Sequence, residues 1–227
     1  MSCYDNNNCY LLLNGSVTRI INGSSSQEEN FDTQGLQLPR SISCPTLDRC
    51  LLVGTNSLIR VTIDSGKTWT ALQLPIQDDF QEVSCPDVNV CIIGAESGKL
   101  IRTEDGGKTW QNISQPSIVG IDSITCPSIE VCYLVGFANP ASHGKTVFVT
   151  TDSGKTWQQG PVHFNRTGAR ARISCPTNTT CYVTGDKGEV LYTNTSGKLW
   201  YSRKTGYDRE IKDISCPTAS KCFIVLA

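Results

Sequence analysis

The cysteines of this 227-residue chain recur at a fixed spacing. All twelve form pairs with five residues between the two members: Cys3/Cys9, Cys44/Cys50, Cys85/Cys91, Cys126/Cys132, Cys175/Cys181 and Cys216/Cys222. The first members of successive pairs stand 41, 41, 41, 49 and 41 residues apart. A constant period of this size indicates a repeat architecture, in which each period is one structural unit that packs on its neighbours.

A second landmark, T-x-D-x-G-x-T-W, recurs in the middle periods at residues 62–69, 103–110 and 150–157, and in degraded form at 193–200. An Asp at the start of a turn accepts backbone N–H bonds, a Gly two residues later supplies positive φ, and a Trp buries a large area. Calcium needs several convergent oxygens, whereas each copy offers one carboxylate, so we predict a structural role. The residues concerned are Asp64, Gly66, Trp69, Asp105, Gly107, Trp110, Asp152, Gly154, Trp157, Gly197 and Trp200.

Short β-rich runs separated by turns, with no helical periodicity, predict an all-β chain. In each period strand A ends at the first Cys, strand B starts at the second, strand C precedes the T-x-D motif, and strand D starts at its Trp. Four strands in a period of this length are typical of one antiparallel β-propeller blade. We expect one propeller domain, residues 1–227, with repeats at about 1–40, 41–81, 82–122, 123–171 and 172–212 and a partial repeat at 213–227.

The number of blades stays open at this point. The first repeat nearly lacks strand A, because only two residues precede Cys3. Residues 211–215 are one candidate to supply that strand and close a five-bladed ring. The alternative is a sixth blade that ends after strand B.

The T-x-D-x-G-x-T-W motif resembles the Asp box, or BNR repeat, of sialidases, sortilin-type domains and photosystem II assembly factor-like propellers. Combined with the C-P-x4-C pairs, it is most similar to secreted BNR and photosystem II assembly factor-like (Ycf48-type) repeat proteins. The resemblance covers nearly the whole chain and implies a β-propeller. It implies little about activity, because the Asp box is shared by unrelated functions.

Each cysteine pair is predicted to form a disulfide within its own repeat, closing the A–B hairpin. Structural zinc is the alternative, but it needs four ligands in one place, and the pairs lie in separate repeats. A loop this short contributes about 2 kcal/mol of stability per bridge. Six bridges imply an oxidising compartment, so we expect an extracellular or secreted protein. The first residues show no signal peptide, and we therefore expect the sequence to be a piece of a longer precursor.

The charge balance limits the classes of partner. The chain has 20 Lys and Arg against 21 Asp and Glu, and no apolar run of 18 residues. A nucleic-acid binder would need a basic excess, and a membrane-spanning helix would need a longer apolar run. We therefore predict neither nucleic-acid binding nor membrane insertion, and no metal or cofactor.

Antiparallel connectivity places the A–B and C–D loops at one end of each repeat, and the B–C and D–A loops at the other. We call the latter the loop end. Both irregularities of the repeat fall at the loop end of the fourth copy, where the B–C loop 137–144 and the D–A loop 160–172 are enlarged. Loops on a rigid scaffold commonly carry binding residues, although a tolerated surface loop is the equal alternative. The candidate ligand-binding residues are His143, His163, Arg166, Arg170, Arg172, Tyr201, Arg203 and Tyr207.

These residues suggest a non-catalytic binding or scaffold propeller that recognises a protein or glycan ligand. Basic and aromatic side chains suit an acidic peptide, a carboxylated glycan or a phosphate-bearing ligand. The alternative is a sialidase-like glycoside hydrolase, which needs an arginine triad, a Tyr nucleophile and an acid carboxylate. No such set is identifiable: Arg60 and Arg102 occupy repeat positions, and the adjacent acids Asp78 and Asp79 lack a partner Tyr.

Overall fold

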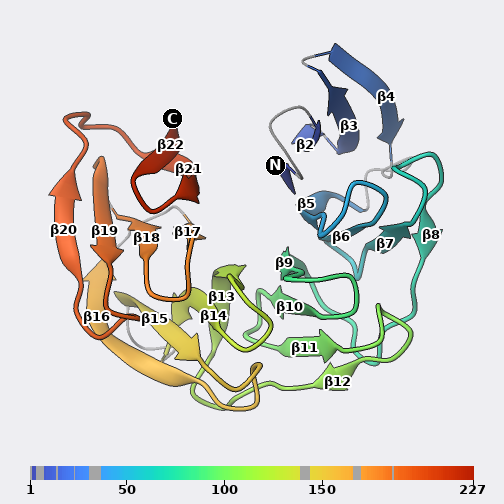
Figure 1. Ribbon diagram of the computed structural model, residues 1–227. Helices are drawn as coiled ribbons and strands as arrows, with labels where there is room; N and C mark the ends of the chain where they lie inside the picture. The colour runs from blue at the N-terminus through green and yellow to red at the C-terminus, as the bar shows by residue number, and fades with distance from the viewer. Residues whose placement is uncertain are drawn as a thin grey trace. The chain divides into compact units, whose positions relative to one another are not determined.

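The computed structural model describes residues 2–3, 8–13, 15–22, 24–30, 37–138, 144–165, 170–185 and 187–227. Every regular element in these ranges is a β-strand, and the strands form five four-stranded antiparallel sheets and one two-stranded sheet (Figure 1). This confirms the predicted β-propeller fold built from four-stranded blades. The chain divides into two compact units, Met1–Asn112 and Ile113–Ala227, and each is described by itself.

Within the described residues, no helix has the length and apolar character needed to cross a membrane.

The first unit holds three sheets, and in each of them every strand pairs with the next one along the chain. Their strands are β1 (Ser2–Cys3), β2 (Asn8–Leu13), β3 (Ser16–Ile21) and β4 (Ser24–Asn30); β5 (Pro39–Ser43), β6 (Cys50–Gly54), β7 (Ile59–Thr62) and β8 (Thr70–Ala71); and β9 (Phe80–Ser84), β10 (Cys91–Ala95), β11 (Leu100–Thr103) and β12 (Gln111–Asn112).

The second unit holds two four-stranded sheets with the same connectivity and one two-stranded sheet. Their strands are β13 (Gly120–Thr125), β14 (Cys132–Phe137), β15 (Gly144–Thr150) and β16 (Gln158–Asn165); β17 (Ile173–Ser174), β18 (Cys181–Thr184), β19 (Glu189–Thr193) and β20 (Tyr201–Lys204); and β21 (Ile211–Thr218) and β22 (Lys221–Leu226).

The two landmarks of the repeat are held in one register. The second Cys of a pair lies opposite the first Thr of the T-x-D motif across strands B and C, in the pairs Cys50↔Thr62, Cys91↔Thr103, Cys132↔Thr150 and Cys181↔Thr193. Five disulfides close the A–B hairpins as predicted, with Cα–Cα distances of 4.0 to 4.1 Å. In the sixth predicted pair, Cys3 lies opposite Cys9, but the side chain of Cys3 is outside the described residues.

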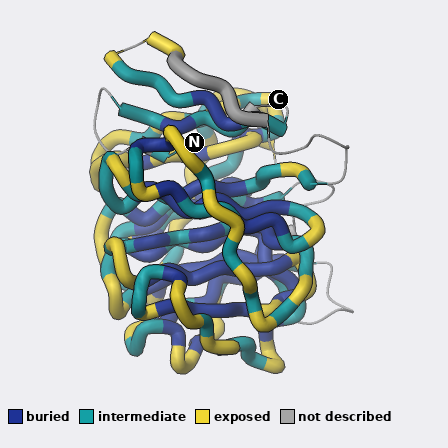
Figure 2. The backbone as a smooth tube through the Cα atoms, turned by 90° about the vertical axis from the view of Figure 1, so that its right-hand side faces the viewer, coloured by how far each residue is buried: buried dark blue, intermediate teal, exposed yellow. Residues whose placement is uncertain are grey.

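Buried side chains lie between neighbouring sheets. In strand β6, Leu51 and Val53 join a cluster with residues of the third sheet, whereas Leu52 joins a cluster with Tyr10 of the first. This division follows from strand geometry, because successive side chains point to opposite faces. Buried residues therefore line the middle of the strands while exposed ones gather at the turns (Figure 2).

The fourth repeat differs from the sequence expectation. Residues 160–165, which were predicted to belong to an enlarged D–A loop, continue strand β16 and pair with Gly144–Thr146 of β15. The strand continues because Phe164 is buried in the core shared with the fifth repeat. The extra residues of this repeat therefore lengthen its outer hairpin as well as its loops.

The sixth repeat is incomplete in the described chain. Strand β21 pairs with β22 to form a sheet of two strands, while the first sheet contains its own short strand β1. Completion of the first repeat by residues 211–215 was one of the two expectations, and it is wrong. The extended run 211–218 is taken up by the hairpin with Lys221–Leu226.

Candidate binding surface

The aspartate of each intact Asp box closes its own turn. Asp64 Oδ1 accepts hydrogen bonds from the Thr62 hydroxyl at 2.8 Å and from the Thr68 amide at 3.0 Å, and Oδ2 accepts one from the Thr68 hydroxyl at 2.7 Å. Asp105 and Asp152 accept the same three bonds in their own repeats. The carboxylate oxygens are thus engaged within the turn.

These bonds stabilise the ionised carboxylates. The threonine hydroxyl four residues on is the largest cause that lowers the pKa of Asp64 and of Asp105 to about 2. For Asp152, burial raises the pKa, but the bonds from Thr156 and Thr150 outweigh this effect and the pKa is lowered. Among the described residues, no three His, Cys, Asp or Glu side chains are grouped so that they could hold a metal ion.

Two successive residues of the box adopt left-handed backbone geometry. Ser65 has φ of 62° and Gly66 has φ of 80°, and the third repeat has Gly106 and Gly107 at the same positions with φ of 73° and 89°. A Cβ added to Gly66 would lie 3.2 Å from the ring of Tyr10 in the preceding repeat, so glycine is needed for space as well as for φ. The motif predicted the glycine, but not the left-handed residue before it.

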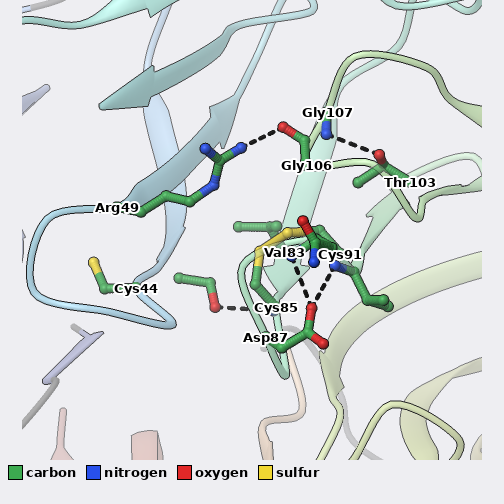
Figure 3. The surroundings of a disulfide bond; sticks show 12 residues. Cys44, Arg49, Val83, Cys85, Asp87, Cys91, Thr103, Gly106 and Gly107 are labelled. Atoms are coloured by element: carbon green, nitrogen blue, oxygen red, sulfur yellow. Dashed lines mark hydrogen bonds between the residues drawn. A yellow bond between two sulfur atoms is a disulfide. The ribbon is translucent and has the colours of Figure 1, made fainter. Parts of the chain in front are cut away.

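The Asp box is tied to the cysteine loop of its own repeat. The amide after the aspartate donates to a carbonyl of that loop, from Ser65 to Asp48 at 3.0 Å and from Gly106 to Asn89 at 2.9 Å. Figure 3 shows the third repeat, where Arg49 of the preceding repeat also donates to the Gly106 carbonyl. Both landmarks therefore lie at one end of the repeat and serve its structure there.

A β-bulge recurs in strand A, four residues before the first Cys. The register shifts around Arg40, Gln81, Asp122 and Lys212, which leaves each of these residues without a partner residue on strand B. Bulges commonly re-aim a side chain. Here they occur toward the loop end, and the residue at the bulge differs in charge from one repeat to the next.

The loop end of the second and third repeats is acidic. Asp78 accepts hydrogen bonds from the Ser97 hydroxyl at 2.6 Å and from Lys99 Nζ at 3.0 Å. The bulge residue Arg40 pairs with Glu96 at 3.1 Å and with Asp79 at 4.0 Å. A hollow of about 350 Å³ opens here. Its lining consists of Asn56, Ser57, Gln77, Asp78 and Asp79.

The loop end of the fourth and fifth repeats is basic. The bulge residue Asp122 forms a buried ion pair with Lys145, and its Oδ2 also accepts the Ala171 amide at 2.9 Å. Arg172 Nη1 donates to the carbonyl of Asp122 at 3.3 Å, while Arg170 lies two residues before it. Three cationic side chains therefore stand against one carboxylate that is already bonded to Lys145. We call Lys145, Asp122, Arg170 and Arg172 the basic cluster.

A second group lies on the outer strands of the fifth repeat. Tyr192 lies between Tyr182 and Tyr201, at ring-centroid distances of 6.2 Å and 5.3 Å. The guanidinium carbon of Arg203 stands 4.7 Å from the centroid of the Tyr192 ring. Tyr201 is 46% exposed. We call Tyr182, Tyr192, Tyr201 and Arg203 the tyrosine face.

The predicted ligand-binding residues thus divide into two groups. Arg170 and Arg172 precede the inner strand β17, whereas Tyr201 and Arg203 lie on the outer strand β20, three strands away in the same sheet. Neighbouring strands are about 5 Å apart, so the two groups lie roughly 14 Å apart across the sheet. His163 is exposed on strand β16, and Tyr207 is exposed in the segment after β20. His143 and Arg166 lie outside the described residues.

Sequence reasoning missed four residues of these groups: Asp122, Lys145, Tyr182 and Tyr192. Each one occupies a regular strand position, and the search for a site was confined to loops. A signal existed for the tyrosines, because Tyr182 follows the second Cys directly and Tyr192 directly precedes the first Thr of the box. The fixed register between these landmarks places the two rings side by side. No sequence signal marks the bulge at Asp122.

Comparison with known proteins gives one family. The model of the photosynthesis system II assembly factor YCF48 matches residues 22–120. This match agrees with the Asp boxes and the four-stranded blades described above. The chain is a propeller of the BNR/Ycf48 type. No curated protein matches its sequence.

Solved structures of BNR/Ycf48-type and other propellers share the fold at low identity. YCF48 bound to D1 peptide is 14% identical with a TM-score of 0.59, covering 99% of this chain and 87% of that one. YCF48 from Cyanidioschyzon merolae is 13% identical with a TM-score of 0.61, covering 100% and 91%. The Niastella koreensis GH74 enzyme is 12% identical with a TM-score of 0.74, and this chain covers 43% of its length.

Proposed function

We propose that this protein is a non-catalytic binding propeller that holds an anionic segment of another protein at its basic cluster. The observation that carries the proposal is the arrangement around Asp122. Its carboxylate is bonded to Lys145 and to the Ala171 amide, which leaves a cationic excess from Arg170 and Arg172 at the loop end. Arginine binds carboxylates through paired, charge-assisted hydrogen bonds, which supports a ligand with carboxylate groups.

The scaffold around the cluster is rigid. The backbone of Arg172 is held in both directions by Thr184, whose hydroxyl accepts the Arg172 amide at 2.9 Å and whose amide donates to the Arg172 carbonyl at 2.9 Å. Asp122, beneath it, is buried. Pre-organised side chains lose little freedom on binding, and this supports recognition without rearrangement of the backbone. His163, and the undescribed His143 and Arg166, belong to the same enlarged loop region and extend the proposed surface.

The acidic hollow supports the non-catalytic part of the proposal. A glycoside hydrolase needs a carboxylic acid whose pKa is raised so that it can donate a proton. Burial raises the pKa of Asp78, but hydrogen bonds from Ser97 and Lys99 outweigh this effect and lower the pKa instead. Asp78 is therefore held as a carboxylate. A sialidase-like activity would appear as turnover of a fluorogenic sialoside, and we expect none.

The disulfides support an oxidising location, and we place the protein outside the cytoplasm. Its partner is then a protein segment that is exposed in the same compartment. A peptide with a cluster of Asp and Glu side chains, or with a free C-terminal carboxylate, has the required chemistry. A carboxylated glycan offers the same charge without the peptide backbone, and the experiment distinguishes the two.

The test is binding of an array of acidic 15-residue peptides, the same peptides with Gln and Asn in place of Glu and Asp, and polyuronic acid fragments. We expect acidic peptides to bind, the amide versions to fail, and Arg172→Ala to weaken binding by about tenfold. Arg40→Ala is the matched control, because Arg40 lies at the acidic loop end. Equal binding by both variants, or binding of glycans alone, would contradict the proposal.

A further inference from the structure

Strand β22 has an open edge in the described chain. Its inner edge pairs with β21, and no described strand pairs with its outer edge. In the second to fifth repeats the corresponding strand B is always covered on that edge by strand C. An uncovered apolar strand is a template for pairing with another chain. Phe223 and Val225 are 57% and 59% exposed, while their counterparts in the second repeat, Leu51 and Val53, are buried.

The tyrosine face continues an existing interface between two sheets. Val183 and Leu191 of the fifth sheet belong to the core shared with the fourth repeat, so Tyr182 and Tyr192 point to the opposite face. The two-stranded sheet packs on that face, and the Tyr182 hydroxyl donates to the Ala219 carbonyl at 2.6 Å. The same row of rings then runs outward to the exposed Tyr201, beyond the two strands of the sixth repeat.

The repeat itself defines what fits this place. In four blades, strand C has an apolar run that ends in a Thr opposite the second Cys, and strand D follows after a short turn. A hairpin of this kind added to β22 would place its Thr opposite Cys222 and its second strand over Tyr201. The residue after that Thr would lie opposite Lys221, just as Glu104 follows Thr103 beyond Cys91. An acidic residue there complements the lysine.

We propose that β22 and the tyrosine face together form a docking site for a β-hairpin of a separate polypeptide. The hairpin adds to the two-stranded sheet as strands C and D and so completes a four-stranded blade. Its first strand is apolar and ends in Thr followed by an acidic residue. Backbone hydrogen bonds along β22 supply affinity, and the tyrosine face selects the second strand, as in other cases of β-strand addition.

This site uses different side chains from the basic cluster. Arg170 and Arg172 take no part in it, and the hairpin is recognised through its backbone and apolar residues. The two proposals can therefore fail independently: loss of acidic-peptide binding in Arg172→Ala says nothing about the hairpin, and the reverse also holds.

The probe is a labelled synthetic peptide with the sequence of residues 99–112, which contains strand C, an Asp box and strand D of the third repeat. We expect saturable binding to the full chain, with hydrogen exchange of the β22 amides slowed at least tenfold in the complex. Tyr201→Ala should weaken binding about tenfold. Ser202→Ala should leave it unchanged, because Ser202 lies on the same strand with its side chain on the opposite face.

A second peptide tests the mode of binding. In the probe, Ile101→Pro removes a backbone N–H and breaks the strand, so its binding should be lost. The proposal is overturned if the original peptide does not bind, if it binds without protecting β22, or if the proline version binds equally well. Equal affinity for Tyr201→Ala and the unchanged protein would also overturn it, because the tyrosine face would then have no role.

Discussion

The loop ends of the second and third repeats and of the fourth and fifth repeats share one backbone design and carry opposite charge. In the first region Arg40 is surrounded by the carboxylates of Asp79 and Glu96. In the second region Asp122 is surrounded by Lys145 and the backbone of Ala171 and Arg172. The residue at the strand A bulge is therefore reversed in sign, and so is the charge around it. The comparison teaches that the repeat fixes the backbone at this point and leaves the chemistry variable.

The opposite end of the repeats shows no such difference. Asp64, Asp105 and Asp152 make the same hydrogen bonds, and the disulfides have the same Cα–Cα distances in both units. A residue that is needed at the same place in every repeat reports on the fold. A residue that changes from one repeat to the next at a fixed position is where function can differ.

The largest expected difference between the two regions concerns their ion pairs. Asp122→Ala leaves Lys145 buried without its carboxylate, which should lower the free energy of unfolding by about 3 to 5 kcal/mol. Asp79→Ala removes one partner of a partly exposed pair and should cost less than about 1 kcal/mol. Urea unfolding of the two variants measures both values. Similar losses in the two variants would break the comparison.

The next effect should be the same in both regions. Removal of Cys85–Cys91 or of Cys175–Cys181 by paired substitution to Ala opens a loop of the same length. Each change should therefore lower the free energy of unfolding by about 2 kcal/mol in the chain-entropy account. Denaturant unfolding of each double variant under non-reducing conditions gives the values. A clear difference between them would show that the stapled end is not equivalent in the two units.

Acid should weaken the Asp boxes by a smaller amount, because their carboxylates are at the surface. The folded pKa of Asp64 and of Asp105 is about 2, below the ordinary value of 3.8. Each group therefore contributes stability that is fully present above pH 3.8 and is lost as the pH falls toward 2. Thermal unfolding between pH 6 and pH 2 should show this loss, and Asp64→Asn should reduce it. An unchanged pH dependence in Asp64→Asn would contradict the assignment.

The smallest effect concerns backbone conformation within the box. Ser65 has positive φ where the third repeat has Gly106. Ser65→Gly should therefore be neutral or stabilising by about 0.5 kcal/mol, whereas Gly106→Ser should destabilise the protein by about 1 kcal/mol. Paired thermal unfolding curves decide the sign. Destabilisation by Ser65→Gly would show that the serine side chain, whose hydroxyl donates to Asp48, matters more than the backbone.

Much of the fold follows from the sequence because its landmarks are local. The cysteine spacing and the T-x-D motif predict the strands, the disulfides and the end at which they meet, since turn chemistry and strand register act over few residues. The fate of residues 211–215 was not predictable, because two pairings of the same apolar strand were open and only tertiary packing decides between them.

The candidate site was predictable only in part. Arg170 and Arg172 stand out because they interrupt a regular repeat. Lys145 and Asp122 look like ordinary strand residues, and their pairing depends on a bulge that no turn residue announces. His163 looked like a loop residue because nothing before Phe164 shows that the strand continues until the neighbouring core is known.

Hydrogen–deuterium exchange of the full chain, with and without a saturating acidic peptide, tests the central claim most directly. If the basic loop end is the binding surface, amides around residues 144–146 and 170–174 should become protected, and those around residues 77–81 and 96–98 should not change. Protection confined to the acidic loop end or to the Asp boxes would contradict the claim, because charge at the strand A bulges would then not determine where this propeller binds.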